Sequence, residues 1–145
     1  MRNILLKLET ALALGLAWLL VFALPLRHTH RLFGQALAPA EAAGAVAPEP
    51  HQMGRAMAMA RRLRFVAGRL PWDSTCLVRA VAGALLLARR RIHGARIRFG
   101  VRKQDGALAA HAWLMLGETT LIGGEEAAGY VPIADLGQLA RQDLH

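Results

Sequence analysis

The sequence is poor in cysteine and in aromatic side chains, and it has no recognisable nucleotide motif. A single cysteine, Cys76, stands among 145 residues, which excludes an internal disulfide framework and a zinc site built from several thiolates. Aromatic residues make up only 6% of the chain. Without a stacking strip, a zinc-finger spacing or an RNA-recognition signature, nucleic acid is not an expected partner. No glycine-rich phosphate loop is present, so any nucleotide requirement is expected to belong to a partner. We expect no metal and no other cofactor.

Acidic residues are scarce over the middle third of the chain. Between Arg55 and Lys103 there are thirteen Arg and Lys residues and one acidic residue, Asp73, so 13 − 1 gives a net charge of +12 for a region of a chain whose total is +8. A region of this kind attracts acidic peptides or anionic lipid.

The N-terminal segment is apolar. Residues 10–26 are almost continuously hydrophobic, at the short end of the range for a membrane span. A span, a cleaved signal peptide and a helix packed on its own domain or on a membrane surface all remain open. Lys7 and Glu9 interrupt the apolar stretch that precedes residue 10, and no small-x-small cleavage site follows cleanly after Pro25, so we favour the packed or interfacial helix. Contact with a membrane surface would then use residues 4–33.

Composition divides the chain into three parts. Residues 1–35 form the apolar helix and a basic amphipathic segment. Residues 36–50 are rich in alanine and proline, as linkers are. Residues 51–145 form the domain that carries the chemistry, and its first helix is predicted from about His51 to Arg69.

The segment LPWDSTCLVRAVAGALLLARRRIHG predicts a helix that begins at a cysteine. Asp73, Ser74 and Thr75 are all residues that favour helix N-caps, and apolar residues recur at helical spacing until His93. Cys76 therefore lies in the first turn, where unpaired N–H groups and the helix dipole favour a thiolate. A buried, unreactive cysteine remains the alternative.

An antiparallel sheet is predicted after this helix. The segments RIRFGV, LAAHAWLML and TTLIG alternate in polarity or are rich in β-branched residues, and KQDG between the first two is a turn sequence. His111 lies near the start of the second strand. Nearly all strand-forming residues fall between 96 and 122, and the first 50 residues are not expected to form a sheet edge. The fold class is therefore α+β, with the cysteine helix packed on a small sheet that carries His111 and with an extra apolar N-terminal helix.

The blocks PWDSTCLVRA and GVRKQDGALAAHAWL closely resemble the lasso-peptide leader peptidases, which are transglutaminase-like cysteine proteases. The resemblance covers about residues 51–133 and extends to the apolar helix that ends in Leu-Pro. It implies a papain-like or transglutaminase-like core in a cytoplasmic enzyme. That enzyme would remove the leader from a ribosomally made precursor peptide before an ATP-dependent cyclase closes the macrolactam. Because the chain has no room for a leader-recognition domain, it resembles a split member that uses a separate leader-recognition protein.

The resemblance also implies roles for individual residues. Cys76 would be the nucleophile and His111 its base. The family places an aspartate about a dozen residues after the histidine, but that interval ends here in Leu-Ile-Gly-Gly, without a carboxylate. Glu125 is the candidate in its place, and a backbone carbonyl or another residue remains an alternative.

Three further residues are expected to contact substrate. Trp72 and Trp113 adjoin the catalytic residues in sequence and would form walls of the cleft, although packing in the core is an alternative for both. Arg79, one turn after the cysteine, would hold a peptide carbonyl or brace a strand. The alternative for the whole chain is a catalytically inactive, basic, membrane-associated adaptor with a protease-like fold.

Overall fold

The computed structural model describes residues 1–23, 37–38, 48–71 and 75–137. The helical elements are α1 (Arg2–Trp18), which continues into the π-helical turn η1 (Leu19–Ala23), then α3 (Pro50–Ala67), α4 (Cys76–Arg89) and the short 3-10 turn η2 (Gly124–Glu126). The strands are β1 (Leu37–Ala38), β2 (Ala95–Gln104), β3 (Ala107–Leu116), β4 (Thr119–Ile122) and β5 (Val131–Gly137). The predicted α+β class with an extra N-terminal helix is confirmed.

The sheet is antiparallel, with the strand order β1-β5-β2-β3-β4. The predicted meander is confirmed as β2, β3 and β4. Its first turn is built on Asp105 and Gly106, whose φ angles of +52° and +80° suit a tight hairpin. The expectation that nearly all strand-forming residues lie between 96 and 122 is wrong, because β5 comes after them. β5 lies beside β2, with Pro132 opposite Gly100 where the pairing shifts register.

The N-terminal half of the chain also contributes to the sheet. β1 pairs with β5 through Leu37 and Ala38, so the expectation that the first 50 residues form no sheet edge is wrong. Two residues form only a short edge.

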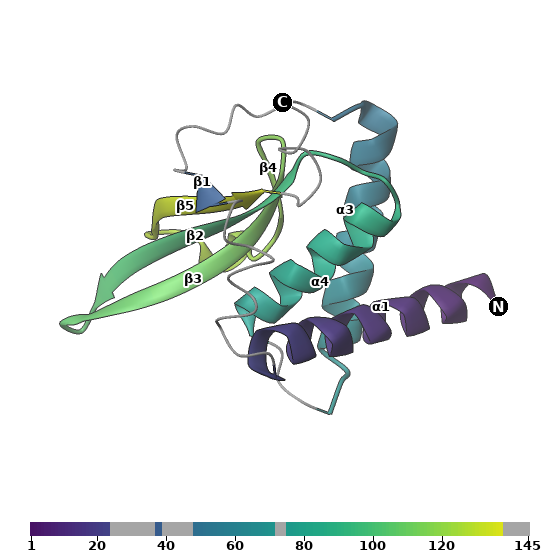
Figure 1. Ribbon diagram of the computed structural model, residues 1–145, viewed down its shortest axis with the longest axis horizontal. Helices are drawn as coiled ribbons and strands as arrows, with labels where there is room; N and C mark the ends of the chain where they lie inside the picture. The colour runs from purple at the N-terminus through teal and green to yellow at the C-terminus, as the bar shows by residue number, and fades with distance from the viewer. Residues whose placement is uncertain (24–36, 39–47, 72–74, 138–145) are drawn as a thin grey trace.

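The core lies between the sheet and the helices (Figure 1). The predicted helix over residues 51–69 is confirmed as α3, and Pro50 occupies its first turn, where a missing N–H has no cost. α4 packs directly on β3, and Gly83 makes the close approach possible. A Cβ at Gly83 would lie 2.6 Å from Cδ2 of Leu114 and 2.8 Å from Cδ1 of Ile122. Six of the large apolar side chains that are fully buried here are Met59, Leu63, Leu86, Leu87, Leu114 and Leu116.

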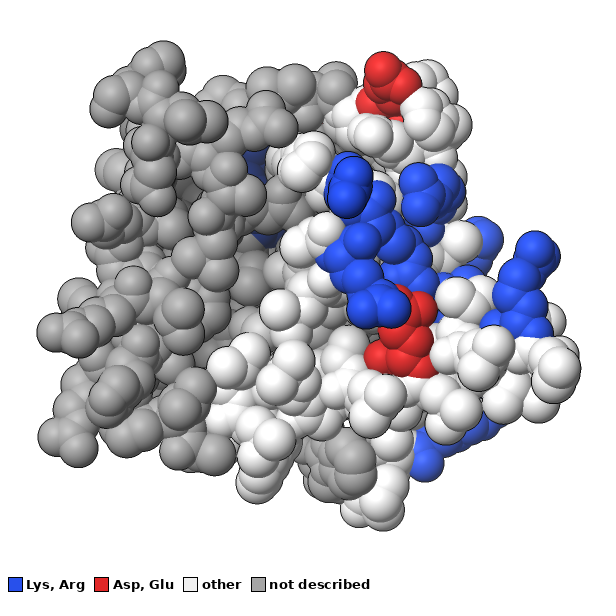
Figure 2. All heavy atoms as spheres, turned by 45° about the vertical axis from the view of Figure 1, so that its right-hand side comes forward, with Lys and Arg blue, Asp and Glu red and all other residues white. Residues whose placement is uncertain are grey.

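Basic side chains are numerous on the helical side of the molecule. Figure 2 shows Lys and Arg crowded between two acidic patches on this face, with uncharged surface beside them. Part of the charge of the middle third lies elsewhere, because Arg96, Arg98, Arg102 and Lys103 belong to β2.

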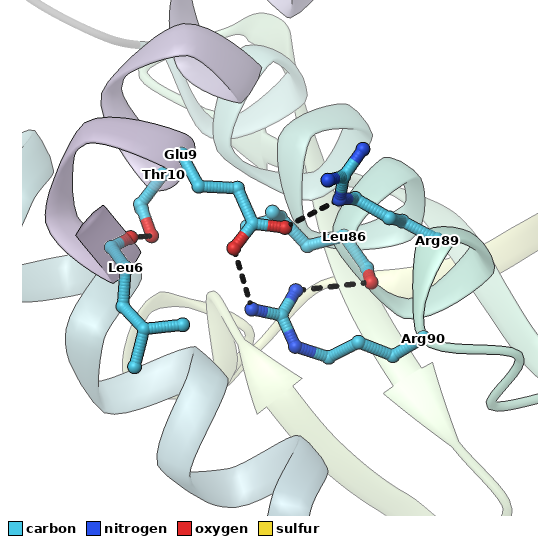
Figure 3. Close-up of polar contacts among 6 residues, drawn as sticks. All are labelled: Leu6, Glu9, Thr10, Leu86, Arg89 and Arg90. Atoms are coloured by element: carbon cyan, nitrogen blue, oxygen red, sulfur yellow. Dashed lines mark hydrogen bonds and ion pairs between the residues drawn. The ribbon is translucent and has the colours of Figure 1, made fainter. Parts of the chain in front are cut away.

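Helix α1 lies on the outside of the helical layer, against α4 and α3 (Figure 1). Thr10, Leu14 and Ala17 are buried in this contact. An ion-pair cluster ties the helix to α4: Glu9 accepts from Nε of Arg89 and Nη2 of Arg90, each at 2.8 Å (Figure 3). The same helix, taken as Arg2–Phe22, is long and apolar enough to cross a membrane by length and composition.

Candidate active site

Cys76 is the first residue of α4, and the residue before it fixes the start of the helix. The Thr75 side chain accepts a hydrogen bond from the N–H of Val78 at 3.3 Å, and its carbonyl accepts from the N–H of Arg79 at 3.0 Å. This N-cap holds the first turn in place. The cysteine side chain is half-buried, so it is positioned by backbone geometry and still accessible.

His111 is held by a backbone carbonyl. Its side chain is almost fully buried, and Nε2 lies 2.9 Å from the carbonyl oxygen of Gly123. A carbonyl oxygen can only accept, so Nε2 carries the proton and donates. In the neutral ring Nδ1 then has the lone pair and is the nitrogen that can accept a proton. Gly123 is twelve residues after His111, the interval at which the aspartate was expected, and its main chain orients the imidazole instead.

Two aromatic rings pack beside the imidazole. Trp113 stacks on it with ring centroids 5.6 Å apart and an interplanar angle of 24°, and Tyr130 lies 5.3 Å away at 42°. Trp113 itself rests on Gly100, where a Cβ would come within 2.6 Å of the indole. The imidazole is thus restrained by rings as well as by its hydrogen bond.

Cys76 and His111 line the same pocket, which has a volume of about 190 Å³. Its remaining lining comes from α3, α4, the end of β4 and the turn after it: Arg64, Arg79, Ile122, Gly123, Gly124 and Glu125. Arg64 donates from Nη1 to the carbonyl of Leu121 at 2.8 Å, so it ties α3 to β4 at the pocket wall. The packing of α3, α4 and β3 against one another therefore brings a thiol, an imidazole and two guanidinium groups to one cavity.

The other predicted residues have different positions. Glu125 and Arg79 line the pocket, and the Glu125 side chain is exposed. Trp113 is buried beside His111, so its predicted contact with substrate stays a prediction. Trp72 lies outside the described residues. Among the residues described, no cluster of three or more His, Cys, Asp or Glu could hold a metal ion.

A backbone carbonyl was one of the alternatives left open as the partner of the imidazole, and the structure identifies it as that of Gly123. Two further contributors were missed: Arg64, through its hydrogen bond to β4, and Tyr130, through its ring. Nothing in the pattern marks Arg64 or Tyr130, since both come from segments that only the fold brings near His111.

The family model of the transglutaminase-like superfamily matches residues 20–135. The chain belongs to this superfamily. The match includes the cysteine helix, the strand of His111 and the turn that holds the imidazole. No curated protein and no solved structure matches the chain. The superfamily includes cysteine peptidases and transglutaminases, and the placement of Cys76 and His111 on one pocket is what cysteine chemistry of this kind requires.

Proposed function

We propose that the chain is a cysteine peptidase that removes the leader from a ribosomally synthesised lasso-peptide precursor. The observation that carries the proposal is the pocket shared by Cys76 and His111, with Nε2 of the imidazole bonded to the Gly123 carbonyl. The superfamily match supports cysteine chemistry. The substrate is supported by the resemblance of PWDSTCLVRA and GVRKQDGALAAHAWL to the leader peptidases.

The reaction follows from the assignment of the ring nitrogens. Nδ1 of His111 takes the proton from the Cys76 thiol, and the thiolate attacks the carbonyl carbon at the end of the leader. The amine of the core peptide then leaves with that proton, and a thioester to Cys76 remains. Nδ1 next takes a proton from water, which attacks the thioester and releases the leader as an acid with the thiol restored.

The helix start also provides for the oxyanion of each tetrahedral intermediate. The N–H of Val78 is engaged by the Thr75 cap, so the donors in this region are the N–H groups of Cys76 and Leu77. Each donor of this type contributes about 3 kcal/mol to the transition state. The cap and the oxyanion site therefore use different N–H groups of the same turn.

The Gly123 carbonyl changes what the third group contributes. It orients the imidazole and fixes its tautomer, as a carboxylate does, but it carries only a partial negative charge. A cysteine nucleophile depends less on a charged third group than a serine does, because a thiol ionises more readily. The site is therefore consistent with catalysis without an aspartate, and Glu125 stays a candidate for a smaller contribution.

A separate leader-recognition protein is part of the proposal, as are the precursor peptide and an ATP-dependent cyclase that acts next. The resemblance to split members of the family supports this separate protein. In the described sheet the outermost strands β1 and β4 have two and four residues, and β4 pairs with β3 only from Leu114 to Leu116. A partner that binds the leader would raise its effective concentration at the pocket.

The test is cleavage of a precursor peptide by the purified full-length protein, followed by mass spectrometry, with and without the leader-binding partner. We expect release of an intact leader acid, slow alone and faster with the partner, and no product from Cys76→Ala. Because the basic surface would dock the partner or an acidic leader, raising the salt concentration should weaken the stimulation. Full activity without the partner would overturn the split arrangement, and cleavage by folded Cys76→Ala would overturn the peptidase.

One observation favours a second candidate, the inactive basic adaptor. The interval after His111 holds Gly123 where the resemblance calls for an aspartate. The two candidates differ in the reactivity of the thiol. An active enzyme should alkylate at Cys76 with iodoacetamide faster than its His111→Ala variant does, whereas equal, slow alkylation of both would favour the adaptor.

A further inference from the structure

Helix α1 has two apolar faces, of which only one packs on the domain. Five leucines recur at intervals of three or four residues and so share the outward face. We call this set the leucine stripe: Leu5, Leu8, Leu12, Leu16 and Leu19, whose side chains are 64%, 56%, 74%, 50% and 51% exposed. The opposite face carries the buried Thr10, Leu14 and Ala17. A helix on the surface of a water-soluble domain is normally polar on its outward face, so the leucine stripe marks an interaction surface.

Aromatic side chains lie at the C-terminal end of the stripe. Trp18 and Phe22 are 41% and 55% exposed, and their ring centroids are 5.5 Å apart. Exposed Trp at the end of an apolar helix is typical of the boundary between lipid tails and headgroups, where the ring is partly buried and partly hydrated.

The domain that carries the stripe is basic. Arg89 of α4 pairs with Glu9 of α1, yet its side chain is 74% exposed. Lys7 precedes the buried Thr10 by three residues and Leu14 by seven, so it shares the face of α1 that packs on the domain, with its ammonium 4.7 Å from the centre of the Phe65 ring. Figure 2 shows this helical side of the molecule with Lys and Arg beside uncharged surface. An apolar stripe on a basic surface is complementary to anionic phospholipid, which offers acyl chains and phosphate oxygens together.

We propose that α1 docks in the plane of an anionic phospholipid bilayer. The leucine stripe enters the boundary between headgroups and acyl chains, and the exposed Arg89 lies near the lipid phosphates. Docking in this way uses the outward face alone and leaves the contacts of α1 with α3 and α4 intact. It holds the catalytic domain on the membrane surface.

Insertion across the bilayer would require a different helix–domain arrangement. Glu9 and Lys7 would have to enter the hydrocarbon or drag lipid headgroups inward, which is costly. The ion pairs from Glu9 to Arg89 and Arg90 would break (Figure 3), and the buried face of α1 would leave the core. In-plane docking needs none of these changes.

A second copy of the chain is a weaker occupant for electrostatic reasons. If two leucine stripes met face to face, two chains that each carry a net charge of +8 would be brought together. Like charges at an interface oppose association, whereas anionic lipid neutralises them. The positive charge of the protein therefore favours an anionic membrane over a second copy of the chain as the partner of the leucine stripe.

The experiment is flotation of the full-length protein with phosphatidylcholine vesicles that contain or lack phosphatidylglycerol. The test variant replaces Leu8, Leu12 and Leu16 with glutamine, and the matched control is Leu108→Gln, since Leu108 is 76% exposed on the β2–β3 hairpin. We expect binding to the anionic vesicles, weakened by salt, and a partition coefficient at least about tenfold lower for the triple variant with no change for the control. Carbonate should release the bound wild-type protein.

Circular dichroism checks that the triple variant is folded, and cleavage of a soluble precursor checks that it is active. We expect the triple variant to keep the wild-type spectrum and the wild-type cleavage rate, because its leucines are exposed and lie outside the catalytic pocket. If it is misfolded, the single variant Leu12→Gln decides, with a smaller loss of binding expected. Binding that the leucine variants leave unchanged, failure of the wild type to bind anionic vesicles, or resistance to carbonate would each overturn the proposal. So would a wild-type dimer that the triple variant converts to a monomer, since the stripe would then be occupied by a second copy.

Discussion

Alanine at Gly123 would add a methyl group beside the imidazole of the proposed base. Gly123 has a φ of +85°, and its Cβ would lie 3.3 Å from Nε2 of His111, 3.0 Å from Cβ of Trp113 and 3.2 Å from the carbonyl oxygen of Ala112. The neighbours at Trp113 and Ala112 belong to or adjoin the β3 main chain and cannot swing aside. The turn must therefore move, and it carries the carbonyl that holds the imidazole.

Two costs follow, and they can be measured separately. A non-glycine residue in the left-handed region costs about 1–2 kcal/mol in the free energy of unfolding. Displacement of the carbonyl also releases His111 from its orientation, and a misplacement of about 1 Å in a catalytic group reduces the rate about 100-fold. We expect kcat/KM of Gly123→Ala to fall by about this factor in molecules that remain folded.

Gly106→Ala is the matched control. Gly106 has a nearly equal φ of +80° at the tip of the β2–β3 hairpin, and nothing lies within 4 Å of its added Cβ. It bears the same backbone cost without contact with the site. The assay compares kcat/KM for precursor cleavage in both variants, corrected for the folded fraction from urea unfolding. If the two variants cleave within about threefold of each other, the Gly123 carbonyl does not position the base.

The remaining predictions concern the nucleophile, the base and the ion-pair cluster. Cys76→Ser and Cys76→Ala should abolish leader removal without loss of circular-dichroism signal. His111→Ala should cost several orders of magnitude in rate, whereas Glu125→Ala should cost less than about tenfold, or about 1.4 kcal/mol, in the same assay; equal losses would show that the carboxylate completes a triad. Glu9→Ala should lower the free energy of urea unfolding by about 1–3 kcal/mol, because Arg90 is only 16% exposed and would lose a charged partner. Glu49→Ala breaks a pair with an exposed His51 and should change that free energy by less than about 0.5 kcal/mol, so equal effects would contradict the assigned role of the α1–α4 ion pairs.

The start of the cysteine helix could be predicted because its signals are local. Thr75 is a residue that caps helices, and the apolar spacing after it spans three turns; both act within a few residues of Cys76. The end of the helix was predicted less well. α4 stops at Arg89, before the predicted stop at His93, and Arg91 already has a φ of +56°. The β2–β3 hairpin was equally readable, because Asp105 and Gly106 supply the two positive φ angles of the turn.

The missing parts of the site and of the fold depend on contacts distant in sequence. β5 contains Pro132, which argues against a strand in a local reading, yet it pairs with β2 at a register shift that accommodates the proline. The partner of His111 is a main-chain oxygen. Every residue has one, so the residue type cannot indicate which carbonyl binds the imidazole. Gly123 is visible in the sequence only as a turn residue, and its role depends on how β4 ends beside β3.

The strand order imposes a sequence of events on synthesis. β3 follows β2 directly, but the other neighbour of β2 is β5, and β1, the first strand of the chain, pairs with β5. A nascent chain that ends before Val131 has already produced every residue that lines the pocket, while one edge of β2 still has unpaired N–H and C=O groups. Such an edge pairs readily with other chains. The ribosome therefore synthesises all the residues of the pocket before it synthesises β5. A chain that ends after the active-site residues would be prone to aggregation rather than active.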